Sequence, residues 1–237
     1  DQPVIQGLPH VSPEDTIREV KRLTGRMVAI NLEPATIKNN DEESVWNLTT
    51  GRQATVDNAR KAADMGVDMI VLTGNPGVGV DNEAIMQALS KLKDAVGDRV
   101  ILTAGKMHAS GIISEAGEKI LTEKDIVDFI DAGADVILLP APGTVPGITM
   151  EYAGKLIKKA HEKGALAMTT IGTSQEGADE DTIRQIALMC KMAGTDIHHI
   201  GDSGYMGMAL PENITAYSVA IRGKRHTYRR MAMSLLR

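Results

Sequence analysis

Lys106 and His108 lie two residues apart, just after the apolar run Val100-Ile-Leu-Thr-Ala, and both could take part in chemistry. A lysine at the end of a strand can hold a phosphate or carboxylate, or form a Schiff base with a carbonyl substrate. Anion binding is the first interpretation; the Schiff base and a plain rim lysine are the alternatives. A histidine titrates near neutral pH, so His108 is a candidate acid, base or metal ligand.

Two carboxylates, Glu33 and Asp202, also follow apolar runs. Each could act as a general base or bind a divalent ion such as magnesium. No HExxH motif or cysteine cluster indicates zinc, and no cofactor is required by the pattern. His198 and His199 lie inside the last apolar run, where alternation points one inward and the other toward surrounding helices. Both are interpreted as buried, hydrogen-bonded histidines.

Two segments rich in glycine and hydroxyl groups follow later apolar runs: Gly172-Thr-Ser-Gln-Glu-Gly177 and Gly201-Asp-Ser-Gly-Tyr-Met-Gly207. Such segments can bind phosphate through backbone N–H groups and hydroxyls, although plain glycine turns are the alternative. The segment Gly74-Asn-Pro-Gly-Val-Gly79 lacks the features of a nucleotide loop, but its Asn75 could hydrogen-bond a substrate oxygen. The residues predicted to bind phosphate or substrate are Asn75, Gly172, Thr173, Ser174, Gly201, Ser203 and Gly204.

The elements that must position these residues are marked by repeated start and stop signals. Six glycines are each predicted to close a helix in the left-handed conformation, shortly before a β-rich run. They are Gly25, Gly66, Gly97, Gly133, Gly164 and Gly194. Helix starts are predicted at Ser12, Asp81, Thr122, Thr149 and Asp179. The sequence therefore predicts an alternating α/β repeat.

The strands read as continuous apolar runs, which is typical of parallel strands covered by helices. Because nearly every strand ends in polar or glycine-rich residues, a (β/α)8 TIM barrel is favoured over an open doubly wound sheet. Only six strands are recognisable, so about the first two are expected to be lacking. We predict one domain over residues 1–237, with a mobile lid or a surface excursion between Pro34 and Ala54.

The amino-acid composition limits the classes of molecule that the protein is expected to bind. The 237 residues carry a net charge of -5, which argues against nucleic acid or an anionic membrane and favours a small anionic metabolite. A single cysteine, Cys190, excludes an internal disulfide and is interpreted as a core residue. No apolar run is long enough to span a membrane. We expect a cytoplasmic protein, and the basic run Arg222–Arg230 is a solvated helix face or a contact within a homo-oligomer.

Several motifs resemble a bacterial TIM-barrel family that is often labelled haloacid dehalogenase-like hydrolase and encoded near sugar phosphotransferase systems. They are Leu72-Thr-Gly-Asn-Pro-Gly, Ala104-Gly-Lys-Met-His, Leu138-Leu-Pro-Ala-Pro-Gly-Thr-Val-Pro-Gly, Ile171-Gly-Thr-Ser-Gln-Glu-Gly and Ile221-Arg-Gly-Lys-Arg-His-Thr-Tyr. The resemblance implies a segment ahead of Asp1 but supplies no catalytic residues. Such phosphatases need Asp-x-Asp at a strand end, whereas Asp179-Glu-Asp181 begins a predicted helix, so that mechanism is excluded.

Together these features predict an enzyme of the lyase or isomerase kind, acting on a small phosphorylated or carboxylated metabolite such as a sugar phosphate. Lys106, His108, Glu33 and Asp202 are the predicted catalytic residues. A non-catalytic metabolite-binding or regulatory protein is the alternative, because a fold alone does not determine function.

Overall fold

The structure, a computed structural model, describes residues 10–35, 48–74, 79–108, 117–172, 175–201 and 209–233. The chain forms two compact units. Unit 1 comprises Asp1–Ala104, Asp131–Asp135 and Met233–Arg237; unit 2 comprises Gly105–Ile130 and Val136–Ala232. The expected single domain over residues 1–237 stays a prediction.

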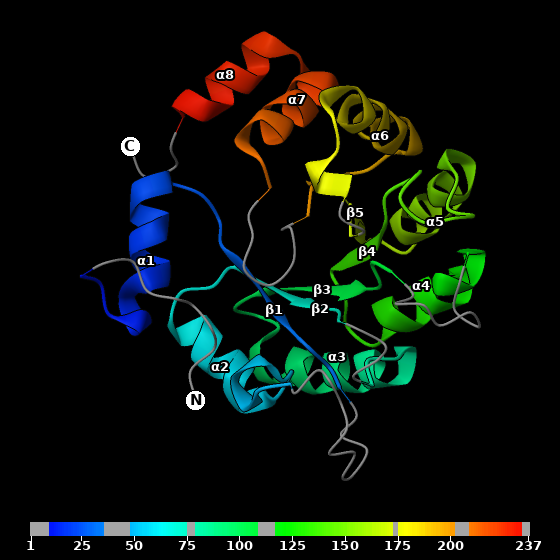
Figure 1. Cartoon of the computed structure of the whole chain (residues 1–237). Coiled ribbons are helices and arrows are strands. Elements are labelled where there is room, and N and C mark those ends of the chain that lie inside the picture. The colour runs from blue at the N-terminus through cyan, green and yellow to red at the C-terminus, as the bar shows by residue number, and fades with distance from the viewer. Residues whose placement is uncertain are drawn as a thin grey trace. The chain divides into compact units, whose positions relative to one another are not determined.

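Unit 1 alternates helices with parallel strands. Its elements are α1 (Pro13–Thr24), β1 (Ala29–Leu32), the short helix η1 (Thr50–Arg52), α2 (Val56–Asp64), β2 (Met69–Leu72), α3 (Asn82–Val96) and most of β3 (Ile101–Gly105). The strands pair in parallel in chain order, β1 with β2 and β2 with β3. In Figure 1, α2 and α3 lie on one side of these strands.

Unit 2 continues the same alternation. Its elements are η4 (Gly117–Ile120), most of α4 (Glu123–Asp131), β4 (Val136–Pro140), α5 (Met150–Glu162), β5 (Leu166–Thr170), η5 (Gln175–Gly177), α6 (Glu180–Ala193), β6 (Ile197–His199), α7 (Pro211–Arg222) and α8 (Lys224–Ala232). Strand β5 pairs in parallel with β4 and with β6. All six predicted strands are therefore present.

The predicted helix starts are confirmed by their hydrogen bonds. The Ser12 side chain accepts from the Asp15 N–H at the start of α1, and Asp81, Thr149 and Asp179 cap α3, α5 and α6 in the same way. At α4, the Thr122 N–H donates to Asp125 Oδ2 at 2.8 Å, and the Asp125 N–H donates to Thr122 Oγ1 at 3.3 Å. This is a capping box with Asp in place of Glu.

Helix α3 ends at Gly97 as predicted, but this glycine does not adopt the predicted left-handed conformation. Gly97 has φ of -66° and stays in the right-handed region, whereas the five other glycines have positive φ. The chain continues there into a further turn before β3. A Cβ added at Gly97 would lie 2.5 Å from the Lys93 carbonyl oxygen, so close backbone approach, not a left-handed conformation, requires glycine here.

An aspartate precedes each of β2, β4 and β6, and its side chain binds a backbone N–H of another segment within the same unit. Within unit 1, Asp68 Oδ2 accepts from the Val28 N–H at 2.8 Å, and Asp135 Oδ2 accepts from the Leu102 N–H at 2.9 Å. Within unit 2, Asp196 Oδ2 accepts from the Ala167 N–H at 2.8 Å. The backbone N–H of each aspartate donates back to the carbonyl of the residue it binds. We call this repeated arrangement the Gly-x-Asp clamp, after Gly66-Val-Asp68, Gly133-Ala-Asp135 and Gly194-Thr-Asp196.

Each clamp aspartate also binds a basic side chain in the last turn of an earlier helix: α1, α3 and α5 supply these side chains. Lys21 Nζ lies 2.8 Å from Asp68 Oδ1, Lys93 Nζ lies 2.9 Å from Asp135 Oδ1, and His161 Nε2 lies 2.7 Å from Asp196 Oδ2. Between β1 and β2 and between β5 and β6, the clamp thus joins two strands and a helix terminus at the amino ends of the strands.

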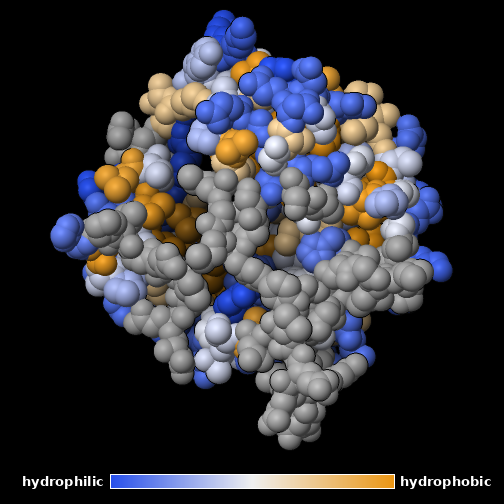
Figure 2. Space-filling view, viewed as in Figure 1, coloured by the Kyte–Doolittle hydropathy of each residue, from blue (hydrophilic) through white to orange (hydrophobic). Residues whose placement is uncertain are grey.

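The side of unit 2 that faces the helices is an apolar core. It consists of Ala141, Ile171, Ile183, Ile186, Ala187, Cys190, Ala216 and Tyr217. Cys190 is fully buried in it, which confirms its interpretation as a core residue. None of the helices in the described ranges is long and apolar enough to cross a membrane. Figure 2 shows a mixed surface, in which hydrophilic residues alternate with small apolar patches.

We expect Asp135→Ala to lower the free energy of unfolding by about 1–3 kcal/mol, because it leaves the buried Leu102 N–H without its side-chain acceptor. Asp135→Asn keeps an acceptor oxygen and should lose less. Asp98 is exposed in the turn before β3, so Asp98→Ala should change stability by less than about 0.5 kcal/mol. Urea unfolding of the three variants checks this, and a stable Asp135→Ala protein would show that the clamp does not support the fold.

Candidate active site

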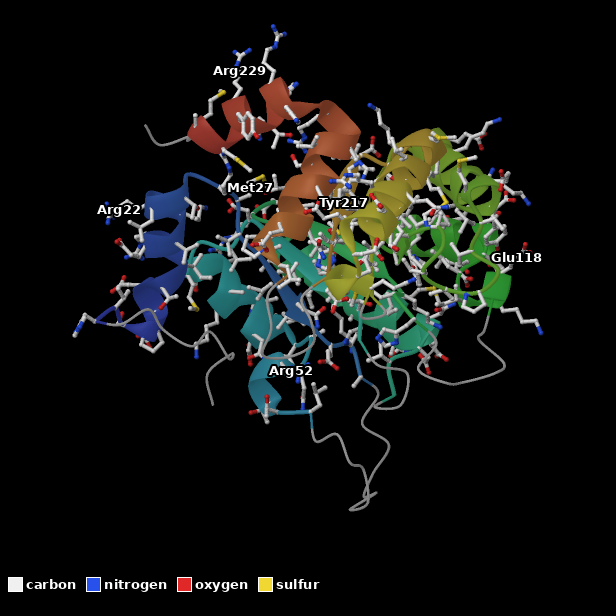
Figure 3. All side chains as sticks on the ribbon, turned by 45° about the horizontal axis from the view of Figure 1, so that its top comes forward. Arg22, Met27, Arg52, Glu118, Tyr217 and Arg229 are labelled. Atoms are coloured by element: carbon white, nitrogen blue, oxygen red, sulfur yellow. The ribbon has the colours of Figure 1, made fainter. Side chains whose placement is uncertain are left out.

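The strand register of unit 2 sorts neighbouring polar side chains onto opposite faces. Thr169 pairs with His198 and Thr170 with His199. Because side chains alternate along a strand, these two pairs face opposite sides of the sheet. His198 faces the helices, since its Nδ1 lies 3.0 Å from the hydroxyl of Tyr217 on α7, which Figure 3 labels. Thr170 and His199 therefore face the other side, and the prediction that the two histidines point in opposite directions is confirmed.

His198 is half-buried and packs against the helix side of the sheet. Its ring meets the Tyr217 ring edge-on, with the ring centroids 5.4 Å apart. Burial lowers the pKa of His198, so the neutral imidazole is favoured. Burial likewise raises the pKa of the Tyr217 hydroxyl and that of the Cys190 thiol. These groups form a neutral polar network within the core.

On the opposite face, three side chains come together at the carboxyl ends of the strands. Thr170 Oγ1 lies 2.7 Å from His199 Nδ1, and the Thr170 hydroxyl donates to Met107 Sδ at 3.5 Å. Met107 also lies against the loop after β5, because a Cβ added at Gly172 would be 2.6 Å from the Met107 Cβ. The segment that carries Lys106 and His108 is thereby placed beside the ends of β5 and β6.

Lys106 follows a tight approach between backbones. A Cβ added at Gly105 would lie 1.8 Å from the Leu138 carbonyl oxygen, so only glycine fits at the end of β3. Lys106 is 3% exposed, and a lysine so deeply buried requires partners for its ammonium. Burial lowers the pKa of the nearby His108, which favours a neutral imidazole able to accept a proton at neutral pH. The catalytic roles of both residues stay predictions.

The loops after β5 and β6 begin in contact. A Cβ added at Gly201 would lie 2.4 Å from the Ile171 carbonyl oxygen and 3.4 Å from Glu176 Oε2. Glu176 is 6% exposed, and the Asn213 amide on α7 donates to its backbone carbonyl at 2.7 Å and to the Ala178 carbonyl at 2.8 Å. Helix α7 therefore holds the loop after β5 in place, and a carboxylate lies at the entrance to the loop after β6.

Unit 1 contains a separate buried ion pair at the carboxyl end of β1. Glu33 is 2% exposed and accepts from the guanidinium of Arg52, a residue of η1 that Figure 3 labels. The backbone supports the pair, because the Glu33 N–H donates to the Arg52 carbonyl at 2.7 Å and the Ala54 N–H donates to the Glu33 carbonyl at 3.0 Å. Burial raises the pKa of the Glu33 carboxyl, although Arg52 opposes the shift. Glu33 is therefore a carboxylate whose proton affinity is increased, as a general base requires.

Close to this pair, Thr73 adds a hydroxyl at the end of β2. Its Oγ1 is buried and has no hydrogen-bond partner in the described part of the chain. Gly74 follows directly, and a Cβ there would lie 3.0 Å from Glu33 Oε2. The ends of β1 and β2 therefore bring an acid, a guanidinium and a hydroxyl into one neighbourhood.

The predicted site residues divide into those that the structure describes and those that it does not. Lys106, His108, Gly172 and Gly201 lie in unit 2, and Glu33 lies in unit 1. The predicted residues outside the described ranges are Asn75, Thr173, Ser174, Asp202, Ser203 and Gly204. A phosphate shared by the loops near Ser174 and Ser203 stays a prediction. Of the predicted lid, residues 36–47 also lie outside these ranges, and its end forms η1.

Within the described ranges, no group of three or more His, Cys, Asp or Glu side chains is arranged to hold a metal ion. Glu33, a predicted ligand, is instead paired with Arg52. The magnesium hypothesis is left to experiment.

Sequence reasoning missed several residues of these neighbourhoods. Arg52 lies in an irregular stretch where no periodicity predicts a partner. Alternation predicted that one of the two adjacent histidines lies on the inner face, but only the strand register and the contact of His198 with Tyr217 identify that histidine as His199. Glu176 was already within the glycine-rich segment, where its carboxylate was a signal beside the hydroxyls.

The model for the family described as "Domain of unknown function (DUF7916)" matches residues 1–237, so the chain belongs to this family. A protein from Haemophilus influenzae named "Putative N-acetylmannosamine-6-phosphate 2-epimerase" is 37% identical over 89 residues, which are 38% of this chain and 33% of that protein. A protein of the same name from Actinobacillus pleuropneumoniae is 36% identical over 88 residues, 37% of this chain and 33% of its own length. The match thus spans about a third of these curated relatives.

Solved structures show the fold. The tetrameric deoxyribose phosphate aldolase from Aeropyrum pernix superposes with a TM-score of 0.55 and 16% identity, covering 90% of this chain and 81% of that one. An archaeal fructose 1,6-bisphosphate aldolase gives a TM-score of 0.51 and 14% identity, covering 70% and 62%. The likeness to these aldolases confirms the expected α/β class with the architecture of a partial (β/α)8 barrel.

The resemblance to a family labelled haloacid dehalogenase-like hydrolase is wrong. The family that matches the whole chain is DUF7916, and the named relatives and structural neighbours are epimerases and aldolases. The shared motifs lie mainly at strand ends, where many barrels carry glycine-rich loops, and they did not identify the correct family.

We expect the stability of the protein to depend on pH through Glu33. Because burial raises its folded-state pKa, the folded protein holds more protons on Glu33 than the unfolded chain between the usual and the raised pKa. The contribution of Glu33 to stability is therefore full at low pH and falls as pH rises through that window. The unfolding free energy of the parent minus that of Glu33→Gln should decrease from about pH 4 upward.

Denaturant unfolding at a series of pH values measures this difference. Glu118→Gln is the matched control, since Glu118 is an exposed carboxylate in η4 whose removal should leave the difference flat. A constant difference between the parent and Glu33→Gln would show that the protonation of Glu33 does not change on folding.

Proposed function

We propose that this DUF7916 member is a cytoplasmic enzyme of the lyase or isomerase kind, which binds a small phosphorylated sugar at the carboxyl ends of its strands. The observation that carries the proposal is the meeting of the loops after β3, β5 and β6, which places the segment Lys106–His108 beside glycine-rich loops. The epimerase names of the curated relatives and the aldolase neighbours support this class of chemistry. A carboxylated metabolite is the alternative ligand.

Epimerases and aldolases that act beside a carbonyl share a chemical requirement. A C–H or C–C bond next to the carbonyl breaks, and its electron pair moves onto the carbonyl oxygen to form an enolate. A cation close to this oxygen stabilises the developing charge. In the proposed site Lys106 supplies it as an ammonium. Alternatively the neutral amine of Lys106 condenses with the carbonyl carbon, water leaves, and the protonated Schiff-base nitrogen takes up the electron pair in place of the oxygen. His108, favoured in its neutral form by burial, could accept a proton.

The phosphate of the sugar would be held by the loops after β5 and β6. Backbone N–H groups and hydroxyls in such loops bind phosphate in many barrels. We assign this role to the segments that begin at Gly172 and Gly201, including Ser174 and Ser203. The contact between the two loop starts supports a shared anion, because it places both segments at one strand edge.

We expect the parent protein to exchange the proton next to the carbonyl of a sugar phosphate with solvent, and Lys106→Met to lose this activity by about 100-fold or more. The methionine keeps a similar length but removes the charge. Proton NMR in D2O measures the exchange, with N-acetylmannosamine 6-phosphate as the first substrate of a sugar-phosphate panel. Borohydride trapping of a covalent adduct would identify the Schiff-base form.

Lys158→Met is the matched control, because Lys158 is an exposed lysine on α5 of the same unit. It should exchange like the parent. A Lys106→Met protein that binds and turns over substrate normally would defeat the assignment of Lys106. A parent that is stabilised by sugar phosphates but exchanges none of them would favour the alternative, a metabolite-binding or regulatory protein.

We also expect the double variant Ser174→Ala, Ser203→Ala to show a smaller rise in melting temperature with sugar phosphate than the parent, because two hydroxyl donors are lost. A ligand that binds only the folded state raises the melting temperature, and at a fixed concentration the rise grows with the logarithm of its affinity. Ser90→Ala, on an exposed position of α3, should respond like the parent. If the melting temperature of the double variant rises as much as that of the parent, the two serines do not bind the phosphate. The same titration with added magnesium tests metal dependence.

A further inference from the structure

His199 and Thr170 form a pair of polar side chains on the inner face of unit 2 that no predicted role accounts for. They are directly paired in register across β5 and β6, with Thr170 Oγ1 2.7 Å from His199 Nδ1. Thr170 is fully buried, whereas His199 is only half-buried. One end of the pair is thus fixed by packing, and the imidazole extends from it.

The neighbouring histidine shows that this arrangement is specific to His199. His198 lies on the opposite face, against Tyr217 in the apolar core, and has a packing role. His199 instead lies next to the loop that begins at Gly201, and its partner Thr170 contacts Met107. Met107 stands between Lys106 and His108 in the chain, so His199 belongs to the strand ends where the proposed substrate binds.

Thr170 also orients the imidazole. Its Oγ1 lies 2.7 Å from His199 Nδ1, and since Thr170 is fully buried this hydrogen bond fixes the ring from one side. A hydrogen bond from a second residue that orients the ring is a common arrangement of catalytic histidines.

We propose that His199 is an acid/base residue of the proposed lyase or isomerase reaction, in addition to His108, and that Thr170 is its positioning residue. The inference rests on the proposed function. The C–H bond next to the carbonyl breaks, its proton goes to the neutral imidazole of His199, and its electron pair forms the enolate that Lys106 stabilises. The imidazolium then returns a proton to the carbon and is neutral again, so no other reactant is needed.

The test compares solvent exchange and binding for His199→Gln in the full chain. Proton exchange from D2O into the sugar phosphate should fall by about 10²–10⁴-fold, while the sugar phosphate still raises the melting temperature. His226→Gln is the matched control, because His226 is exposed on α8 of the same unit and should leave exchange unchanged.

Thr170 supplies a second variant, which also applies if His199→Gln fails to fold. Thr170→Val keeps the side-chain shape and removes the hydroxyl; it should slow exchange and shift the acidic limb of its pH–rate profile. Thr170→Ser restores a hydroxyl and should restore the profile. A purely structural threonine would change stability without moving the profile.

The outcomes separate the two proposals. A parent that exchanges, together with His199→Gln and Thr170→Val proteins that exchange equally well with an unshifted profile, overturns the role of His199 alone. A parent that exchanges no sugar phosphate overturns the proposed enzyme and with it the proton transfer. Loss of both exchange and binding in a folded His199→Gln protein assigns His199 to ligand binding and overturns its acid/base role.

Discussion

The Gly-x-Asp clamp is the interaction on which the arrangement of the strands depends. A carboxylate at the start of β2, β4 and β6 accepts from the backbone of the preceding strand and also binds a basic side chain of a neighbouring helix. A charged acceptor makes a stronger hydrogen bond than a carbonyl does, and here it repeats at each second strand. Within each unit the amino ends of β1 and β2 and of β5 and β6 are thereby set in register, and register decides which residues face the helices and which face inward.

Rigid amino ends leave the carboxyl ends for chemistry, as in other barrels. In unit 2 the fixed register separates two almost identical pairs. Thr169 and His198 complete a neutral, buried network with Tyr217, whereas Thr170 and His199 lie beside Met107 at the loop ends. The physical difference lies in the partners, because both imidazoles are half-buried but His198 packs edge-on against Tyr217 of α7, whereas His199 is paired with Thr170 at the strand end. One strand can therefore contribute both to the core and to the proposed proton transfer.

Glu33 in unit 1 shows how burial changes the protonation of a carboxylate. Desolvation raises the pKa of its carboxyl despite the ion pair with Arg52, so the residue has a stronger affinity for a proton than an exposed glutamate. A buried pair of this kind adds little net stability but positions its members accurately. The same burial that weakens the charge therefore suits Glu33 to proton transfer, the role that its strand-end position predicted.

The sequence by itself determined the α/β class, the six strands, the helix caps and the concentration of polar residues after the strands. These features are local, because caps, glycine stops and apolar runs act within a few residues of one another. The tertiary structure alone decided that Arg52 pairs with Glu33, that Met107 meets Thr170, and that His199 faces inward while His198 faces Tyr217. Register and long-range packing create these contacts between segments far apart in the chain, and no local pattern encodes them.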